Sequence, residues 1–381
     1  MKKVLIFYAR YGGGHLSAAT SITEYIRLHV EGVEPVAIDF MAYLSKTIDK
    51  ITTSAYEEMT KKAPALWGSF YMQAEKGPLA RLSADTNKLM AFRLRSLIAE
   101  HEPDYIISTH PFSSQMCAYL KREGKLPGIR LGTVMTDYAP HDQWLIGSEY
   151  TDYFFVAHAQ MRQELISRGV APEKVFTTGI PVAEKFFLPY DEAKIREDFG
   201  LQEGKFTILF FAGGMMSLCP EQNYEILEDM ARYMEDVQII VVAGKDPETF
   251  QAFTEIVQRY HRESDIKILG FTDRVQDLMH VSDIVISKPG GLTSTESICC
   301  GLPMIIINPI PGQEEQNAEF LEEHGLGYWI RKDDNPIGAI FRIVKTPALF
   351  NELRQNVLPL KGHRATQKIC SVMFSDLTES D

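Results

Sequence analysis

Residues 283–325 read DIVISKPGGLTSTESICCGLPMIIINPIPGQEEQNAEFLEEHG. Two short apolar runs, 283–287 and 303–307, each lead into a turn rich in glycine or proline, and each turn is followed by a segment long enough for a helix. Continuous apolar strands that alternate with helices are typical of a parallel sheet covered on both faces. This stretch therefore predicts two consecutive strand–helix units of an α/β domain.

The same alternation extends along most of the 381 residues. Runs that predict strands form two series, 4–8, 35–40, 105–109, 131–136, 153–157 and 174–179, then 206–212, 237–244, 266–270, 283–287, 303–307 and 327–330. Between the series, residues 181–205 contain two prolines and many charges, which indicates a linker with one short helix. The sequence predicts two doubly wound α/β domains, with a ligand-binding cleft between their carboxyl strand ends.

Composition excludes several classes of protein. Hydrophobic residues make up 45% and charged residues 24%, as in ordinary globular chains. Five cysteines at irregular spacing exclude a disulfide scaffold and a zinc pattern, and they fit a reducing, cytosolic compartment. The apolar run that follows Lys2 and Lys3 is too short for a signal peptide, and none reaches the roughly 18 residues of a membrane span. The net charge of −12 argues against a nucleic-acid partner.

Charge is distributed unevenly along the chain. Residues 1–180 carry 20 basic and 19 acidic side chains, and the remainder carry 19 and 32. Within the first half, residues 41–99 contain 9 basic and 5 acidic side chains, interleaved with aromatic residues and without a strand-like run. Such a pattern is typical of amphipathic helices packed on the domain, and helices that lie on a membrane surface are the alternative.

A glycine-rich turn follows the first predicted strand of each series. Gly12, Gly13 and Gly14 precede His15 and open a helix, whose N-terminus offers free N–H groups to a polar or anionic ligand. The pair Gly213 and Gly214 holds the corresponding place in the second series. The first turn has neither G-x-G-x-x-G spacing nor a Walker lysine, so it does not support a dinucleotide site or a P-loop. Both turns also have a structural alternative. His15 would then only cap its helix, and Gly213 and Gly214 would only form a tight turn.

The opening stretch predicts a pocket for a nucleotide sugar. Backbone N–H groups and hydroxyls at one helix start suit a diphosphate, and a carboxylate one turn later suits a ribose diol. The residues concerned are Gly290, Gly291, Thr293, Ser294 and Glu296, with Gln313 and Glu314 at the next helix start for a sugar with many hydroxyls. No Asp-x-Asp, HxH or HExxH sequence occurs, so the pocket is expected to work without a metal.

Six motifs together resemble one enzyme family: GGGHLSAA (12–19), THPFSS (109–114), TDYAPHDQW (136–144), TGIPV (178–182), KPGGLTSTE (288–296) and PIPGQEEQNA (309–318). They are similar to motifs of the monogalactosyldiacylglycerol synthase and processive diacylglycerol glucosyltransferase group of glycosyltransferase family 28. The resemblance implies a glycosyltransferase-B fold, with two Rossmann-like domains whose parallel sheets face each other across a cleft. It also implies inverting transfer from a UDP-sugar by one general base, without a metal or another cofactor.

The resemblance also assigns residues. It implies catalytic roles for His15 and Asp137, and acceptor contacts by Gly13, Gly14, His110 and His141. His141 lies one place closer to Asp137 than in the family motif T-D-x-x-x-x-H. The implied donor-binding residues are Gly213, Gly214, Phe271 beside the uracil, Gly290, Gly291, Thr293 and Ser294 at the diphosphate, Glu296 at the ribose, and Gln313 and Glu314 at the sugar.

The resulting hypothesis is a peripheral enzyme on the cytosolic face of the cell membrane. It transfers glucose or galactose from a UDP-sugar to diacylglycerol and contacts anionic lipid through residues 41–99. The expected division is an acceptor domain at 1–180, a linker at 181–205, a donor domain at 206–362 and a C-terminal helix at 363–381 that returns to the first domain. The alternatives are a UDP-sugar epimerase or hydrolase on the same fold, and a UDP-sugar-binding protein without activity.

Overall fold

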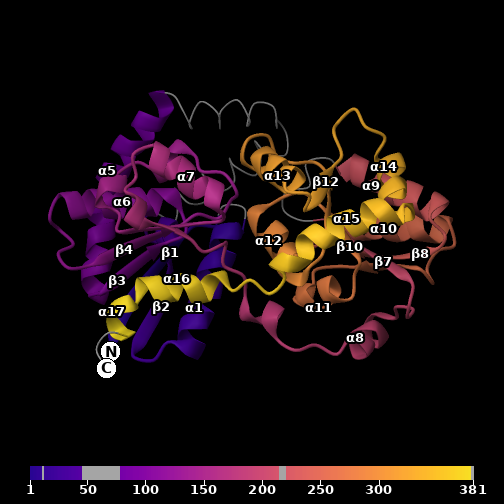
Figure 1. Ribbon diagram of the computed structural model, residues 1–381, viewed down its shortest axis with the longest axis horizontal. Helices are drawn as coiled ribbons and strands as arrows, with labels where there is room; N and C mark the ends of the chain where they lie inside the picture. Colours follow the sequence, from indigo (N-terminus) through magenta and orange to yellow (C-terminus); the bar gives the residue numbers. More distant parts are fainter. Residues whose placement is uncertain (11–12, 45–77, 214–219, 379–381) are drawn as a thin grey trace. The chain divides into compact units, whose positions relative to one another are not determined.

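The computed structural model describes residues 1–10, 13–44, 78–213 and 220–378 (Figure 1). They form two compact units, one from the described parts of 1–184 with 363–378, and the other from those of 185–362. Each unit contains one six-stranded parallel sheet. All twelve strands expected from the sequence are present, so the prediction of two parallel α/β sheets is confirmed.

The sheet of the first unit has the order β2-β1-β3-β4-β5-β6. Its strands are β1 (Lys2–Tyr8), β2 (Val33–Asp39), β3 (Tyr105–Ser108), β4 (Arg130–Val134), β5 (Tyr153–Val156) and β6 (Val175–Thr177). Its helices are α1 (Gly14–His29), α2 (Phe40–Leu44), α5 (Pro78–His101), α6 (Pro111–Arg122), α7 (Ala159–Ser167), α16 (Ala365–Met373) and α17 (Ser375–Thr378), with short 3₁₀ turns at η1 (Asp142–Trp144), η2 (Ser148–Tyr150) and η3 (Pro172–Lys174). The strand order reverses between β1 and β3, as in doubly wound folds.

Side-chain alternation along β1 explains why helices cover both faces of this sheet. Leu5 and Phe7 join the apolar cluster that α5 and α6 complete, whereas Val4 and Ile6 join the cluster that α1 and α16 complete. All four side chains are fully buried. Because successive residues of a strand point to opposite faces, one continuous apolar run supplies both cores.

The C-terminal helix belongs to the first unit, where α16 lies beside α1 (Figure 1). The Tyr105 hydroxyl donates to the Asp376 carboxylate at 2.8 Å, and Arg130 forms an ion pair with the same carboxylate at 2.9 Å. The His363 ring contacts the Thr178 carbonyl oxygen at 2.7 Å where the chain returns. These polar contacts, with the apolar residues of α16, attach the end of the chain to the first sheet.

The segment 41–99 is described only in part. Residues 41–44 lie in α2 and 78–99 lie in α5, and these described residues include no strand, as expected. The predictions for residues 45–77 concern a region outside the described residues. Among the helices that the structure describes, none has the length and apolar character to span a bilayer.

The sheet of the second unit has the order β12-β11-β10-β7-β8-β9. Its strands are β7 (Phe206–Phe211), β8 (Val237–Val242), β9 (Ile266–Leu269), β10 (Ile284–Ser287), β11 (Met304–Ile306) and β12 (Gly327–Trp329). Its helices are α8 (Glu192–Phe199), α9 (Pro220–Tyr233), α10 (Pro247–Arg259), α11 (Val275–His280), α12 (Gly291–Cys300), α13 (Gln313–Glu323), α14 (Pro336–Lys345) and α15 (Pro347–Val357), with 3₁₀ turns η4 (Glu184–Phe187), which begins on the last residue of the first unit, and η5 (Leu358–Leu360). This is the Rossmann strand order, with its reversal between β7 and β10.

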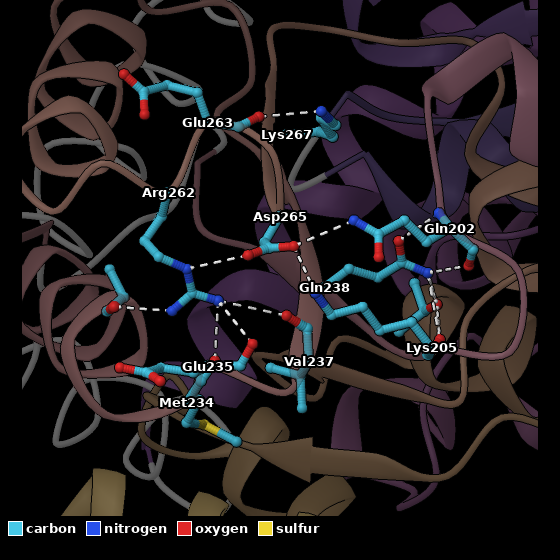
Figure 2. Close-up of polar contacts among 12 residues, drawn as sticks. Gln202, Lys205, Met234, Glu235, Val237, Gln238, Arg262, Glu263, Asp265 and Lys267 are labelled. Carbon is cyan, nitrogen blue, oxygen red and sulfur yellow. Dashed lines mark hydrogen bonds and ion pairs between the residues drawn. The ribbon is translucent and has the colours of Figure 1, made fainter.

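A buried polar network holds the amino ends of β7, β8 and β9 together (Figure 2). The Arg262 guanidinium donates to the carbonyl oxygens of Ala231 and Met234 at 2.9 and 3.0 Å, and it pairs with Asp265 at 3.3 Å. Lys205 pairs with the other oxygen of Asp265. Burial alone would raise the pKa of Asp265, but the hydrogen bond and charge of Lys205, with the charge of Arg262, lower it. The network therefore fixes the amino-terminal edge of the second sheet, which is opposite to its carboxyl edge.

We expect Arg262→Met to lower the free energy of unfolding of the second unit by about 3 kcal/mol, since buried carbonyl oxygens lose their donor and Asp265 keeps only Lys205 as a partner. Arg259→Met is the matched control, because its ion pair with Glu228 is exposed and contributes about 0.5 kcal/mol or less. Urea unfolding of both variants measures the difference. Equal losses in the two variants would contradict a structural role for the network.

Candidate active site

One group of candidate site residues lies where the strand order reverses in the first unit. The neighbouring strands β1 and β3 lead there into α1 and α6, which cover opposite faces of the sheet. Loops at such a reversal are not covered by a crossover helix, which is why they bind ligands in α/β folds. Gly13 caps α1 at φ 82°, a conformation that glycine adopts without strain, and Gly14 is the first helical residue.

His15 is held at this point by groups from two neighbouring strands. Its Nδ1 lies 2.5 Å from the Thr109 carbonyl oxygen and 3.2 Å from the Thr136 hydroxyl. The Thr109 hydroxyl donates in turn to the His15 carbonyl oxygen at 2.9 Å. Because a carbonyl oxygen only accepts, the hydrogen is on Nδ1 and the lone pair is on Nε2. Burial lowers the pKa of His15 to about 4, which keeps the ring neutral at physiological pH.

Two further histidines surround His15. The His110 ring lies 4.6 Å from the His15 ring, between centroids, and its Nδ1 accepts from the Phe112 N–H at 3.2 Å at the start of α6. The His141 and Trp144 ring centroids are 5.7 Å apart, and the Trp144 and His15 ring centroids are 6.4 Å apart. Burial lowers the pKa of His110 well below its ordinary value, and the charges of His15 and His141 lower it further. Burial also lowers the pKa of His141 to about 3.

Asp137 lies on the loop that follows β4, directly after Thr136, and its side chain is buried. The next residue of this loop, Tyr138, accepts a hydrogen bond from His158 Nε2 through its carbonyl oxygen at 2.8 Å. The structure therefore brings His15, His110 and His141 together and places Asp137 next in the chain to a residue that contacts His15. Across the described residues, no group of three or more His, Cys, Asp or Glu side chains could hold a metal ion.

A separate group of candidate site residues lies at the strand reversal of the second unit. Gly213 follows β7 so closely beside β8 that an added Cβ would lie 1.7 Å from the Ala243 carbonyl oxygen. Only glycine fits there without moving the backbone. Gly214 lies outside the described residues, so its expected contact with the donor stays a prediction.

Helix α12 presents its N-terminus at the same edge, directly after β10. Gly290 is the cap residue, and the first helical hydrogen bond runs from the Ser294 N–H to the Gly290 carbonyl at 2.9 Å. The N–H groups of Gly291, Leu292 and Thr293 precede this bond and have no partner within the helix. The Thr293 side chain is partly exposed, but Ser294 is fully buried and its hydroxyl points to the Met304 sulfur at 3.9 Å. Of the two residues predicted to supply hydroxyls, only Thr293 is therefore partly exposed.

Glu296 is one turn further along α12 and is partly exposed. Burial raises the pKa of Glu296 to about 7, although the charge of Lys185 lowers it. Within the part of the chain that the structure describes, its carboxylate makes no hydrogen bond. The two hydroxyls of a bound diol could therefore donate hydrogen bonds to this carboxylate.

The start of α13 supplies Gln313, which is partly exposed, and Glu314, which is not. The Lys288 ammonium contacts Glu314 Oε1 at 2.6 Å, and the Ile310 N–H donates to Oε2 at 2.9 Å. Phe271, on the loop after β9, is 65% exposed, and the Lys245 ammonium lies 4.4 Å from its ring centroid. Both groups of residues lie at the carboxyl edge of the second sheet, as expected for loops that follow parallel strands.

Sequence reasoning missed the groups that hold the predicted residues. Thr109 and Thr136 fix His15, and Lys288 pairs with Glu314, but none of the three was predicted as a site residue. The available signal was their position, because Thr109 and Lys288 follow strands at the reversal point and Thr136 follows the next strand, β4.

Two family models match the chain. Residues 15–182 match monogalactosyldiacylglycerol (MGDG) synthase, and residues 208–356 match the glycosyltransferase family 28 C-terminal domain. The processive diacylglycerol beta-glucosyltransferase of Bacillus pumilus is 30% identical over 371 residues, which cover 97% of this chain and 93% of that protein. The protein of the same name from Bacillus subtilis is 29% identical, with 94% and 91% covered.

Solved structures share the fold at low sequence identity. MurG from Acinetobacter baumannii has a TM-score of 0.65 at 16% identity and covers 98% of this chain, with 100% of its own. A UDP-GlcNAc 2-epimerase from Neisseria meningitidis, bound to UDP-GlcNAc, has a TM-score of 0.62 at 13% identity, with 98% and 100% covered. At these identities the likeness shows the fold alone. The expected glycosyltransferase-B fold class is confirmed, and the cleft between its domains stays a prediction.

We expect the His15 ring to stay neutral, with its hydrogen on Nδ1, from pH 8 down to about pH 5, because its pKa lies near 4 rather than near 6.5. ¹⁵N NMR of histidine-labelled protein measures this, and His15→Gln identifies the resonance. Since the unfolded chain binds the proton more readily, the stability of the first unit should fall as the pH drops below about 6.5. Titration of His15 near pH 6.5 would contradict the geometry.

Proposed function

The chain belongs to the monogalactosyldiacylglycerol synthase and processive diacylglycerol beta-glucosyltransferase group of glycosyltransferase family 28, and we propose that it transfers a hexose from a UDP-sugar to diacylglycerol. The product is a β-linked glycolipid, formed with inversion at the anomeric carbon. The geometry of His15 carries this proposal, because a neutral imidazole with a fixed tautomer stands at the strand reversal of the first unit. Glucose and galactose are the two sugars to be tested.

In the proposed reaction, the acceptor hydroxyl gives its proton to a base and its oxygen attacks the anomeric carbon. The bond from that carbon to the diphosphate breaks, and UDP leaves. His15 is suited to the role of base, because Nε2 holds the lone pair and Thr109 and Thr136 fix the ring. Asp137, beside Thr136, is the second candidate for the base. Gly13, Gly14, His110 and His141 are the proposed acceptor-side residues.

We assign the donor to the carboxyl edge of the second sheet. The open N–H groups at the start of α12, together with Gly290 and the Thr293 hydroxyl, suit the diphosphate and stabilise the charge that develops on UDP as it leaves. Glu296 suits the ribose diol, and Phe271 lies at the proposed uracil site. Gln313 and Glu314 are proposed to position the hexose.

A transfer assay tests this function. Labelled UDP-glucose or UDP-galactose is incubated with diacylglycerol vesicles, and the lipid products are separated. We expect β-linked glycolipid, and we expect His15→Ala to lower kcat by about 10²–10⁴-fold because the base is lost. His29→Ala is the matched control, because this exposed histidine lies at the far end of the same helix.

Each other outcome of this assay identifies an alternative. Free hexose or an epimerised UDP-sugar without lipid product would indicate a hydrolase or an epimerase, and UDP binding without turnover would indicate a binding protein. A larger loss in Asp137→Asn than in His15→Ala would assign the base to Asp137. Free hexose without lipid product, an epimerised UDP-sugar without lipid product, or UDP binding without turnover would contradict the proposed transfer.

We further propose that the enzyme acts from the cytosolic face of the membrane, which it contacts through residues 41–99. The described part of this segment supports contact with anionic lipid, because Phe92 is 50% exposed on α5 and the neighbouring Arg93 and Arg95 are also exposed. The Phe92 ring meets Tyr119 on α6, and the Arg122 guanidinium lies 4.8 Å from the centroid of the Tyr119 ring. Aromatic and basic side chains thus share one surface of the first unit.

Sedimentation with phosphatidylglycerol vesicles tests this contact. We expect the double variant Phe92→Ser/Arg95→Glu to bind vesicles less tightly at low salt than the unsubstituted chain, because an apolar anchor and a positive charge are lost. Phe341→Ser in the second unit, where the ring is 44% exposed, is the control and should sediment normally. Equal sedimentation of all three proteins would rule out this surface.

A further inference from the structure

A buried carboxylate joins the two loops of the second unit that the donor is proposed to occupy. Glu314, at the start of α13, has a side chain that is 5% exposed. One of its oxygens contacts the Lys288 ammonium at 2.6 Å, and the other accepts from the Ile310 N–H at 2.9 Å. Lys288 directly follows β10, whereas Ile310 lies on the loop after β11. Glu314 therefore fixes the two loops to each other.

The same carboxylate lies against the cap of α12. A Cβ added to Gly290 would lie 3.6 Å from Glu314 Oε1. The turn cannot swing away easily, because the buried Asn317 side chain donates to the Pro289 carbonyl oxygen at 3.0 Å. A negative charge is thus held close to the N–H groups at the start of α12.

This position creates an electrostatic conflict with the proposed donor. A diphosphate that binds the start of α12 would bring its own negative charges near a carboxylate that water screens poorly. The Lys288 ammonium removes the conflict, because it cancels the carboxylate charge directly beside the turn. The Lys288 side chain is 34% exposed, whereas that of Glu314 is 5% exposed.

We propose that Lys288 is a positioning residue that neutralises Glu314, so that the start of α12 accepts the diphosphate while Glu314 holds the two loops together. This inference rests on the proposed function, in which the donor is a UDP-sugar. Lys288 acts here through Glu314 rather than as a phosphate ligand. The two roles predict different results when both side chains are replaced.

Calorimetric binding of UDP and of uridine to the full chain tests the inference. We expect Lys288→Met to weaken UDP binding by about tenfold or more, because the buried carboxylate is left unpaired beside the diphosphate. Uridine carries no phosphate, so its affinity should not change. Glu314→Gln should bind UDP at least as tightly as the unsubstituted chain, since Gln can still accept from the Ile310 N–H. The double variant Lys288→Met/Glu314→Gln should recover UDP affinity.

The control is Lys345→Met, which removes an ion pair of the same 2.6 Å length to Asp236, on the surface and outside the proposed donor site. It should bind UDP and uridine normally. A double variant as weak as Lys288→Met would overturn the inference, because Lys288 would then be a direct phosphate ligand. Equal losses of uridine and UDP affinity in Lys288→Met would also overturn it, because they indicate a collapsed loop.

The same experiment separates this inference from the proposed function. UDP binding by the unsubstituted chain with no change in Lys288→Met would overturn the role of Lys288 and leave the proposed donor intact. Failure of the unsubstituted chain to bind UDP would overturn the proposed donor, and the inference with it.

Discussion

Each sheet is built outward from its first strand in two directions, and the loops at the point of reversal cannot be covered by a crossover helix. In the first unit this constraint brings the turn before α1 and the loop after β3 together, so that His15 meets Thr109 across 94 residues of sequence. In the second unit it brings Gly213 and the start of α12 to the same edge. The candidate site residues of these loops lie where the topology leaves no crossover helix above the sheet edge.

Burial at these loops sets the charge of the groups that chemistry would use. Desolvation disfavours the charged form, so the same cause lowers the pKa of His15 and His110 and raises that of Glu296. A histidine kept neutral is able to accept a proton. A carboxylate with a pKa of about 7 changes its charge within the physiological range. Glu314 shows the other solution, in which a buried carboxylate is paired with Lys288.

Apolar runs predicted all twelve strands, because strands of a sheet covered on both faces are mostly apolar. Glycine turns and polar helix starts predicted where the site lies, since these residue types are needed where backbone meets a ligand. Side-chain direction could not be predicted in the same way. Thr293 and Ser294 are adjacent and chemically alike, yet helix geometry leaves one partly exposed and buries the other against Met304.

The sequence by itself determined the strands, the two α/β units and the family, because local apolar pattern and motif order are written along the chain. Only the tertiary structure decided which distant groups meet. The tautomer of His15 depends on the Thr109 carbonyl oxygen, on the loop after β3. The charge of Glu314 is balanced by Lys288, which lies 26 residues earlier in the chain. Hydrogen bonds and ion pairs act over a few ångströms, so strand order, rather than position in the chain, sets these partners.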